Sequence, residues 1–94
     1  MSDIALSTTV TVKNSKGLHL RPADALVQKA QEFSASIAFV RDGDRFDAKS
    51  VLEIMTLGAA QGTELQLEAQ GEDAEQALQE LAAMFDCGFD ENEP

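Results

Sequence analysis

The chain has 94 residues, which is the size of one small domain and too short for two separate hydrophobic cores. Its 17 acidic and 7 basic residues give a formal net charge of −10, which opposes binding to nucleic acid or to an anionic membrane surface. The single cysteine, Cys87, excludes an internal disulfide, and one Cys with one His is too small a ligand set for a zinc site.

A strand, a helix and a hairpin are predicted in the first half of the chain. From Ile4 to Lys13, mostly apolar residues alternate with more polar ones, which predicts a strand with one buried face. Helical spacing then predicts a helix from about Leu20 to Phe33, and Pro22 is compatible with it because it falls in the first turn. The segments "ASIAFV" and "RFDA" flank "RDGD", where Asp42 and Gly43 suit the positive-φ positions of a tight hairpin.

A short helix, a strand and a longer helix are predicted in the second half. In "SVLEIMTLG", Ser50 and Glu53 have the spacing of a capping box, and Gly58 suits a helix C-cap. The alternation in "TELQLEAQ" predicts a strand, and "EDAEQALQELAAMFDC" returns to helical spacing. Asp73 with Gln76 is predicted to cap this last helix.

The order of these elements, β-α-β-β-α-β-α, predicts an α+β fold. Each helix has one apolar stripe and the strands have one apolar face, so two layers bury the apolar residues. We therefore expect an open-faced β-sandwich: a four-stranded antiparallel sheet with helices on one face and polar side chains in water on the other. Residues 1–89 are predicted to form this single domain, and the acidic segment "DENEP" at 90–94 is predicted to be a disordered tail.

The segment "NSKGLHLRPADAL", residues 14–26, contains the single histidine of the chain at the predicted start of a helix. The first turn of a helix presents backbone N–H groups and a positive dipole end, and therefore favours an anion. Gly17 permits a close approach to the helix, Pro22 fixes its first turn, and Arg21 adds a cation that can grip phosphate oxygens. A neutral imidazole is a good nucleophile toward phosphorus, so His19 is a candidate phosphoryl carrier.

Two segments carry a resemblance to a known family. "GLHLRPA" at residues 17–23 resembles the active-site signature of the HPr family, the histidine phosphocarriers of the bacterial sugar phosphotransferase system. "DAKSVLEIMTLGAAQGTELQLEAQGEDAEQAL" at residues 47–78 resembles the regulatory-serine region of the same family and the strand and helix that follow it. The similarity covers nearly the whole chain, from Ser7 to Gly88.

The resemblance implies a phosphocarrier that is not a turnover enzyme and that needs no cofactor. His19 would accept a phosphoryl group from enzyme I, the phosphoenolpyruvate-dependent kinase of the system, and pass it to an A-type enzyme II component or a related acceptor. Arg21 matches the family's active-site arginine, and Ser50 matches the serine that a dedicated HPr kinase/phosphorylase modifies in many relatives. The residues that resemble the family's docking patch beside the active site are Val51, Leu52 and Met55.

Three residues depart from the family pattern. Leu20 replaces the small residue that usually follows the histidine, and Asp24 stands where many relatives have an uncharged residue. Glu53 occupies a position that is often glycine or lysine. We expect Leu20 and Asp24 to take part in partner docking beside His19, so these departures bear on which enzyme I and which acceptors the chain meets.

Other interpretations stay open at this level. A lone histidine near a helix start more often caps the helix or packs against it, and the spacing of Ser50 and Glu53 fits a helix N-cap whether or not a kinase exists. A nitrogen-type or regulatory branch would use the same chemistry with different partners, and a protein-binding module would use only the docking patch. An enzyme is the weakest alternative, because there is no nucleophile triad and no glycine-rich nucleotide loop. Without a secretory signal or a membrane-spanning run, we expect a cytoplasmic monomer with no membrane insertion.

Overall fold

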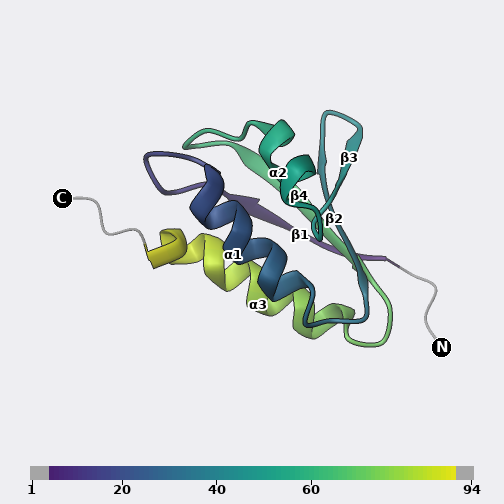
Figure 1. Cartoon of the computed structure of the whole chain (residues 1–94). Coiled ribbons are helices and arrows are strands. Elements are labelled where there is room, and N and C mark those ends of the chain that lie inside the picture. The colour runs from purple at the N-terminus through teal and green to yellow at the C-terminus, as the bar shows by residue number, and fades with distance from the viewer. Residues whose placement is uncertain (1–4, 91–94) are drawn as a thin grey trace.

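The strands form one antiparallel sheet (Figure 1). Within residues 5–90, the part of the chain that the computed structural model describes, four strands pair in the order β1-β4-β2-β3. In that order they are β1 (Leu6–Thr11), β4 (Glu64–Gln70), β2 (Ser36–Arg41) and β3 (Asp44–Asp47). All three pairings are antiparallel, which confirms the predicted sheet. Ile4, at the start of the predicted first strand, lies outside the described residues.

One face of the sheet is buried because apolar residues alternate along its central strands. Leu65 and Leu67 of β4 are buried, and Phe39 of β2 lies opposite Leu67 and is fully buried. The edge strand β1 follows the predicted alternation only in part: Val10 is buried, whereas Leu6 is 38% exposed. Leu6 begins a strand that has β4 on one side only, so its side chain is covered less than those of the central strands.

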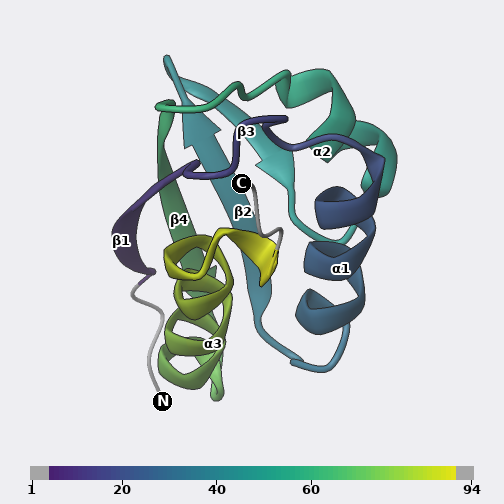
Figure 2. The ribbon, with the colours of Figure 1, turned by 90° about the vertical axis from the view of Figure 1, so that its left-hand side faces the viewer.

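The helices pack on the buried face of the sheet. In the described chain they are α1 (Leu20–Ala30), α2 (Val51–Leu57) and α3 (Ala74–Asp86), and a short 3₁₀ turn, η1 (Gly88–Asp90), follows α3. Figure 2 shows α1 and α3 on the same side of the sheet. The opposite face carries polar contacts between strands, such as the hydrogen bond from Thr9 to Gln66 and the ion pair of Arg45 with Glu68. The structure is therefore the predicted α+β open-faced sandwich.

Of two predictions about where elements end, one is confirmed and the other is wrong. The β2–β3 hairpin turns at Asp42 and Gly43, whose φ values of 53° and 85° are the positive values that a type I′ turn requires, so this prediction is confirmed. The first helix was predicted to reach Phe33, which is wrong, because α1 ends at Ala30. The N–H of Phe33 bonds to the carbonyl of Ala30 three residues back, so the chain leaves the helix through a tightened last turn.

Asp73 does not cap α3 in the predicted way. It occupies the N-cap position, but among the described residues its carboxylate makes no capping hydrogen bond. Its two oxygens instead accept the backbone N–H groups of Ser34, at 2.9 Å, and Ala35, at 2.8 Å. Gln76, the predicted capping partner, donates to Glu80. Asp73 therefore ties the start of α3 to the α1–β2 connection, a tertiary contact that local spacing does not reveal.

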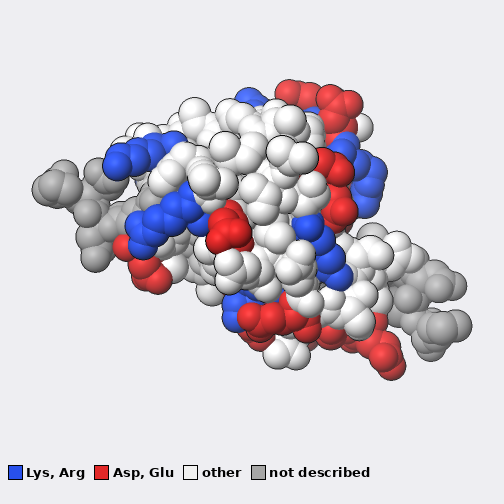
Figure 3. All heavy atoms as spheres, in the orientation of Figure 1, with Lys and Arg blue, Asp and Glu red and all other residues white. Residues whose placement is uncertain are grey.

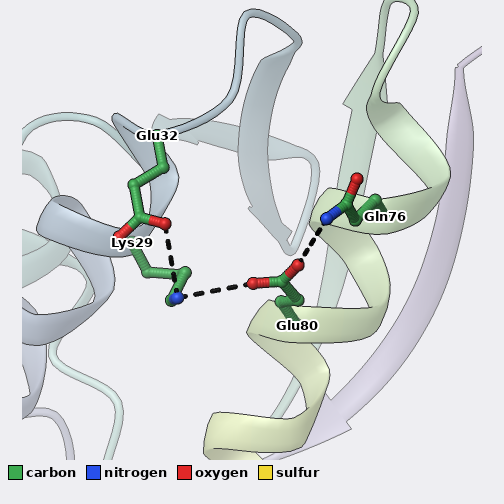
Figure 4. A network of polar contacts seen from close by, with 4 residues as sticks. All are labelled: Lys29, Glu32, Gln76 and Glu80. Atoms are coloured by element: carbon green, nitrogen blue, oxygen red, sulfur yellow. Dashed lines mark hydrogen bonds and ion pairs between the residues drawn. The ribbon is translucent and has the colours of Figure 1, made fainter.

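A polar network joins α1 to α3 (Figure 4). The Nζ atom of Lys29 lies 3.3 Å from Oε1 of Glu80 and 3.4 Å from Oε1 of Glu32. The hydrogen bond with Glu80 raises the pKa of Lys29, and hydrogen bonds from Gln76 and then from Lys29 lower the pKa of Glu80. Because water reaches these groups, the network contributes more to the mutual orientation of the helices than to stability.

Two further predictions concern the C-terminal tail and membrane insertion. Of the predicted tail, Asp90 belongs to η1 and residues 91–94 lie outside the described part of the chain, so the tail stays a prediction. Between residues 5 and 90, no helix combines the length and the apolar character that crossing a membrane requires.

Candidate functional site

His19 stands at the N-cap of α1. Its backbone is extended, with φ −76° and ψ −173°, and its carbonyl accepts the N–H of Ala23 at 3.0 Å, which closes the first turn. Its side chain is half-buried and makes no capping hydrogen bond to the described first turn. The interpretation of His19 as a side-chain cap of the helix is therefore wrong.

The first turn of α1 is arranged to favour an anion beside His19. Leu20, Arg21 and Pro22 form this turn, and Pro22 has no N–H group, so the amide N–H groups of the turn come from Leu20 and Arg21. The positive end of the helix dipole lies at this turn, and Arg21, which carries a guanidinium group, belongs to it. Figure 3 shows Lys and Arg side chains gathered over the β1–α1 loop and the start of α1. These side chains bring positive charge to the end of the chain that carries His19.

The loop before His19 rests directly on the α2–β4 connection. Gly17 has a φ of 68°, and a Cβ atom placed on it would lie 2.5 Å from the carbonyl oxygen of Ala59. The next residue, Leu18, donates its N–H to that same oxygen at 2.9 Å. Only glycine fits here without displacing the loop, for two reasons: the backbone is left-handed, and the neighbouring chain lies in contact.

Asn14 is a site residue that the sequence did not single out. It is a buried polar residue, 4% exposed, at the first position of the turn that leads to His19. Its carbonyl accepts the N–H of Gly17 at 3.1 Å, and its side-chain Nδ2 donates to the carbonyl of Gly17 at 2.7 Å. Asparagine at the first position of a β-turn with glycine at the fourth is a familiar turn signal, and it could have identified this contact.

A surface cavity of about 250 Å³ lies beside Arg21, between α1 and the end of the described chain. Its lining residues come from the start of α1, the end of α3 and η1: Arg21, Pro22, Ala25, Met84, Cys87, Phe89 and Asp90. Phe89 is buried, and its ring packs edge-on against the ring of Phe85 with the centroids 4.9 Å apart. This contact fixes η1 against α3 and so sets one wall of the cavity.

Ser50 is the N-cap of α2. Its Oγ accepts the N–H of Glu53 at 3.3 Å, which confirms the predicted cap. The carboxylate of Glu53 accepts the N–H of Asp47 at 2.9 Å and not that of Ser50, so the capping box is only half formed. At the other end, Gly58 is left-handed with φ 62°, as predicted, and Arg41 donates to the carbonyl of Leu57 at 2.9 Å. Both ends of this short helix are therefore held by specific contacts.

Comparison with known proteins shows the family. Residues 6–86 match the family model described as "PTS HPr component phosphorylation site". The chain belongs to the HPr family. It is 43% identical to the HPr-like protein Crh of Bacillus subtilis over 79% of this chain and 87% of Crh. It is 36% identical to phosphocarrier protein NPr of Escherichia coli over 95% of this chain and all of NPr. A crystal structure of HPr from Thermoanaerobacter tengcongensis superposes with a TM-score of 0.89, at 39% identity, covering 94% of this chain and 99% of that one.

The family assignment indicates what kind of protein this site belongs to. HPr proteins are phosphocarriers of the phosphotransferase system and not turnover enzymes. In the part of the chain from residue 5 to residue 90, no three His, Cys, Asp or Glu side chains lie close enough together to hold a metal ion. The described segments next to His19 are the first turn of α1, which includes Arg21, and the loop held by Asn14 and Ala59.

Three large apolar side chains, here named the apolar patch, are exposed on α1 and α2 of this HPr-family chain. Leu20 is 61% exposed, Leu52 79% and Met55 40%. The two helices pack against each other, and Figure 3 shows an uncharged surface over α2 beside the Lys and Arg side chains at the start of α1. Val51, also a predicted docking residue, is half-buried and packs against the core. The structure therefore separates Leu52 and Met55, which face solvent, from Val51.

Asp24 is exposed, one turn after Leu20 on α1. Its Oδ2 accepts the side-chain Nε2 of Gln28 at 2.7 Å. Gln28 lies in the following turn, so the carboxylate of Asp24 is directed along α1 toward its C-terminal end. The charge lies near the predicted approach path of a partner without being directed at His19.

Proposed function

We propose that this HPr-family chain carries a phosphoryl group on His19, accepts it from phosphorylated enzyme I and passes it to an A-type enzyme II component or a related acceptor. The observation that supports this most strongly is the position of His19. It occupies the N-cap of α1, and its imidazole is not used to cap the helix. A nucleophilic side chain therefore stands where the helix start can stabilise an anion.

The proposed step is an in-line transfer of the phosphoryl group from the donor to the imidazole of His19. The lone-pair nitrogen of the His19 imidazole attacks phosphorus, the new N–P bond forms as the bond to the donor breaks, and the electron pair of that bond leaves with the donor. Charge on the phosphoryl oxygens is stabilised by the N–H groups of the first turn and by Arg21. Positioning and electrostatics suffice for this kind of transfer, which is why a small domain can perform it.

The apolar patch is the proposed docking surface for both donor and acceptor. The large apolar side chains of Leu20, Leu52 and Met55 are exposed, and the fold does not require them to face solvent. Leu20 directly follows His19, and Leu52 and Met55 lie on α2, which packs against α1, so we expect a partner that covers them also to exclude water from the site.

Regulation at Ser50 is a separate part of the proposal. The hydroxyl of Ser50 already accepts a hydrogen bond at the N-terminus of α2, a position where a phosphate is electrostatically favourable. A phosphoryl group would add about −1.5 to −2 charge there. We therefore expect modification by an HPr kinase/phosphorylase to leave α2 folded and to weaken contacts between the apolar patch and enzyme I.

We also propose that the chain is located in the cytoplasm and is a monomer. The relatives give a specific alternative for assembly, because a structure of Crh is described as a dimer. Sedimentation of the purified chain over a range of concentrations distinguishes the two states. A concentration-independent monomer is expected.

The direct test of the carrier function is phosphoryl transfer through the chain to an acceptor. Radiolabelled phosphoenolpyruvate, enzyme I and an A-type enzyme II component are mixed with the protein, without it, or with the His19→Ala variant. Label is expected to reach the acceptor only when the unaltered chain is present. Label that reaches the acceptor equally with His19→Ala would contradict the proposal.

A second test separates the branches of the family. The similarity to both NPr and Crh favours keeping a nitrogen-type or regulatory branch as the alternative. These branches share the chemistry at His19 and differ in partners. Rates of His19 phosphorylation by sugar-type and nitrogen-type enzyme I, measured side by side, identify the cognate donor. Binding of enzyme I without any phosphorylation would instead favour a protein-binding module.

A further inference from the structure

The peptide group between Gly17 and Leu18 is held at both of its polar ends. Its carbonyl oxygen, on Gly17, accepts Nδ2 of Asn14 at 2.7 Å. Its N–H, on Leu18, donates to the carbonyl of Ala59 at 2.9 Å. A peptide plane with both groups bonded to different segments cannot rotate without breaking one of these bonds. This peptide lies immediately before the one that joins Leu18 to His19.

Asn14 is itself held in place by the end of the sheet. Beyond the last residue of β1, the N–H of Val12 donates to the carbonyl of Thr63 at 2.9 Å, and the carbonyl of Val12 accepts the N–H of Gly62 at 2.7 Å. The side chain of Gln61 donates to the carbonyl of Lys13 at 3.0 Å. Asn14 therefore extends from a fixed point, and its amide transmits that position to the loop.

The orientation of the peptide group between Gly17 and Leu18 affects His19 because of the residues that surround it. The side chain of Leu18 is buried, at 5% exposure, and His19 follows it directly as the N-cap of α1. Rotation of the held peptide would change the backbone angles of Leu18 and so displace the imidazole relative to the first turn. Errors of about 1 Å in the placement of reacting groups lower transfer rates by up to about 100-fold.

We propose that Asn14 is a positioning residue for the phosphorylation of His19, acting through its hydrogen bond to the Gly17 carbonyl. The inference rests on the proposed function of His19 as phosphoryl acceptor. Asn14 contributes no group to the phosphoryl transfer. Its amide fixes the loop in the one conformation in which the imidazole meets the helix start.

Two variants test this, with a control matched for stability. Asn14→Ala removes the side-chain donor, and Asn14→Asp keeps the size of the side chain while placing an acceptor against the Gly17 carbonyl. The control is Ile37→Val, which removes a buried methylene from β2, in a different part of the sheet. Initial rates of phosphorylation by enzyme I are measured for each folded variant as a function of its concentration, together with amide hydrogen exchange at Leu18.

The expected result is a kcat lowered roughly tenfold in both Asn14 variants with KM changed by less than about twofold, because the apolar patch is intact. The control should keep its kcat, and exchange at Leu18 should accelerate only in the Asn14 variants. Equal loss of kcat in Ile37→Val, a rise in KM alone, or unchanged rates in both Asn14 variants would overturn the inference. Absence of phosphorylation in the unaltered chain would instead overturn the proposed function, and the two failures are thereby distinguishable.

Discussion

Replacement of Gly17 by alanine should be costly because the position combines a left-handed backbone with a close neighbour. At φ 68°, an L-residue costs about 1–2 kcal/mol relative to the right-handed region. The added Cβ would lie 2.5 Å from the Ala59 carbonyl oxygen, so the loop must move and the hydrogen bond from Leu18 is strained or lost. That bond contributes about 1 kcal/mol. Together these effects predict a loss of roughly 2–3 kcal/mol in the free energy of unfolding.

A matched glycine separates the two causes. Gly43 also has a positive φ, of 85°, but no heavy atom of the described residues outside its immediate neighbours lies within 4 Å of the position that a Cβ would take. Gly43→Ala should therefore cost only the backbone share of this loss, about 1–2 kcal/mol. For a domain of this size, 1 kcal/mol shifts Tm by about 4–8 °C, so the Gly17 variant should melt roughly 10–20 °C below the unaltered chain.

Thermal unfolding followed by circular dichroism, with urea titration as a second measure, decides between these values. The expected order of stability is the unaltered chain, then Gly43→Ala, then Gly17→Ala. Equal losses in the two variants would refute the reasoning, because they would show that the contact with the Ala59 carbonyl contributes nothing beyond the backbone conformation.

Three further outcomes are expected. Ser50→Asp should keep the N-cap of α2, and hence Tm, but should slow phosphorylation by enzyme I through negative charge beside the apolar patch; equal initial rates would contradict this. Asp24→Ala should speed transfer from a non-cognate enzyme I at low salt, with a gain that shrinks as salt rises, and only modestly because its carboxylate is directed toward Gln28; a slower rate would indicate a specific contact. In the folded state the pKa of Asp73 lies below its ordinary value of 3.8, because its carboxylate accepts hydrogen bonds from the backbone N–H of Ser34, which has the larger effect, and of Ala35. The stability that the ionised carboxylate contributes is therefore fully present above pH 3.8 and is lost as the pH falls below it. Urea titrations of Asp73→Asn should therefore show a deficit relative to the unaltered chain at pH 7 that narrows below pH 3.8, and a constant deficit would contradict this.

The features that local spacing encodes were predictable from the sequence. The alternation in β4 and the positive-φ pair Asp42 and Gly43 depend on residues close together in the chain, and both are confirmed. The same holds for the two caps of α2, Ser50 and Gly58, whose partners lie within a few residues. His19 was recognised as a helix-start residue for the same reason.

The features that depend on distant segments were not predictable in this way. The carboxylate of Asp73 bonds to Ser34 and Ala35, which are far away in sequence, so its local spacing suggested a cap that does not form. The support of the His19 loop by Ala59 has no local signal at all, because a backbone carbonyl carries no residue identity.

Packing also determines which apolar residues of α2 are buried and which are exposed, a distinction that the periodicity of the sequence does not make. Ile54 and Leu57 are buried, whereas Leu52 and Met55 are exposed, and only the placement of α2 against α1 and the sheet decides which side faces the core. The candidate docking surface therefore became defined only in three dimensions.

The most direct test of the central claim is the mass of the intact chain after incubation with phosphoenolpyruvate and a cognate enzyme I. The account predicts that the unaltered protein gains one phosphoryl group, which is lost in brief acid and survives alkali, as a phosphoramidate does and a phosphoserine does not. His19→Ala, with an unchanged unfolding midpoint, should gain none. An acid-labile phosphoryl group on His19→Ala, or an acid-stable one on the unaltered chain, would contradict the assignment of His19 as the phosphoryl acceptor.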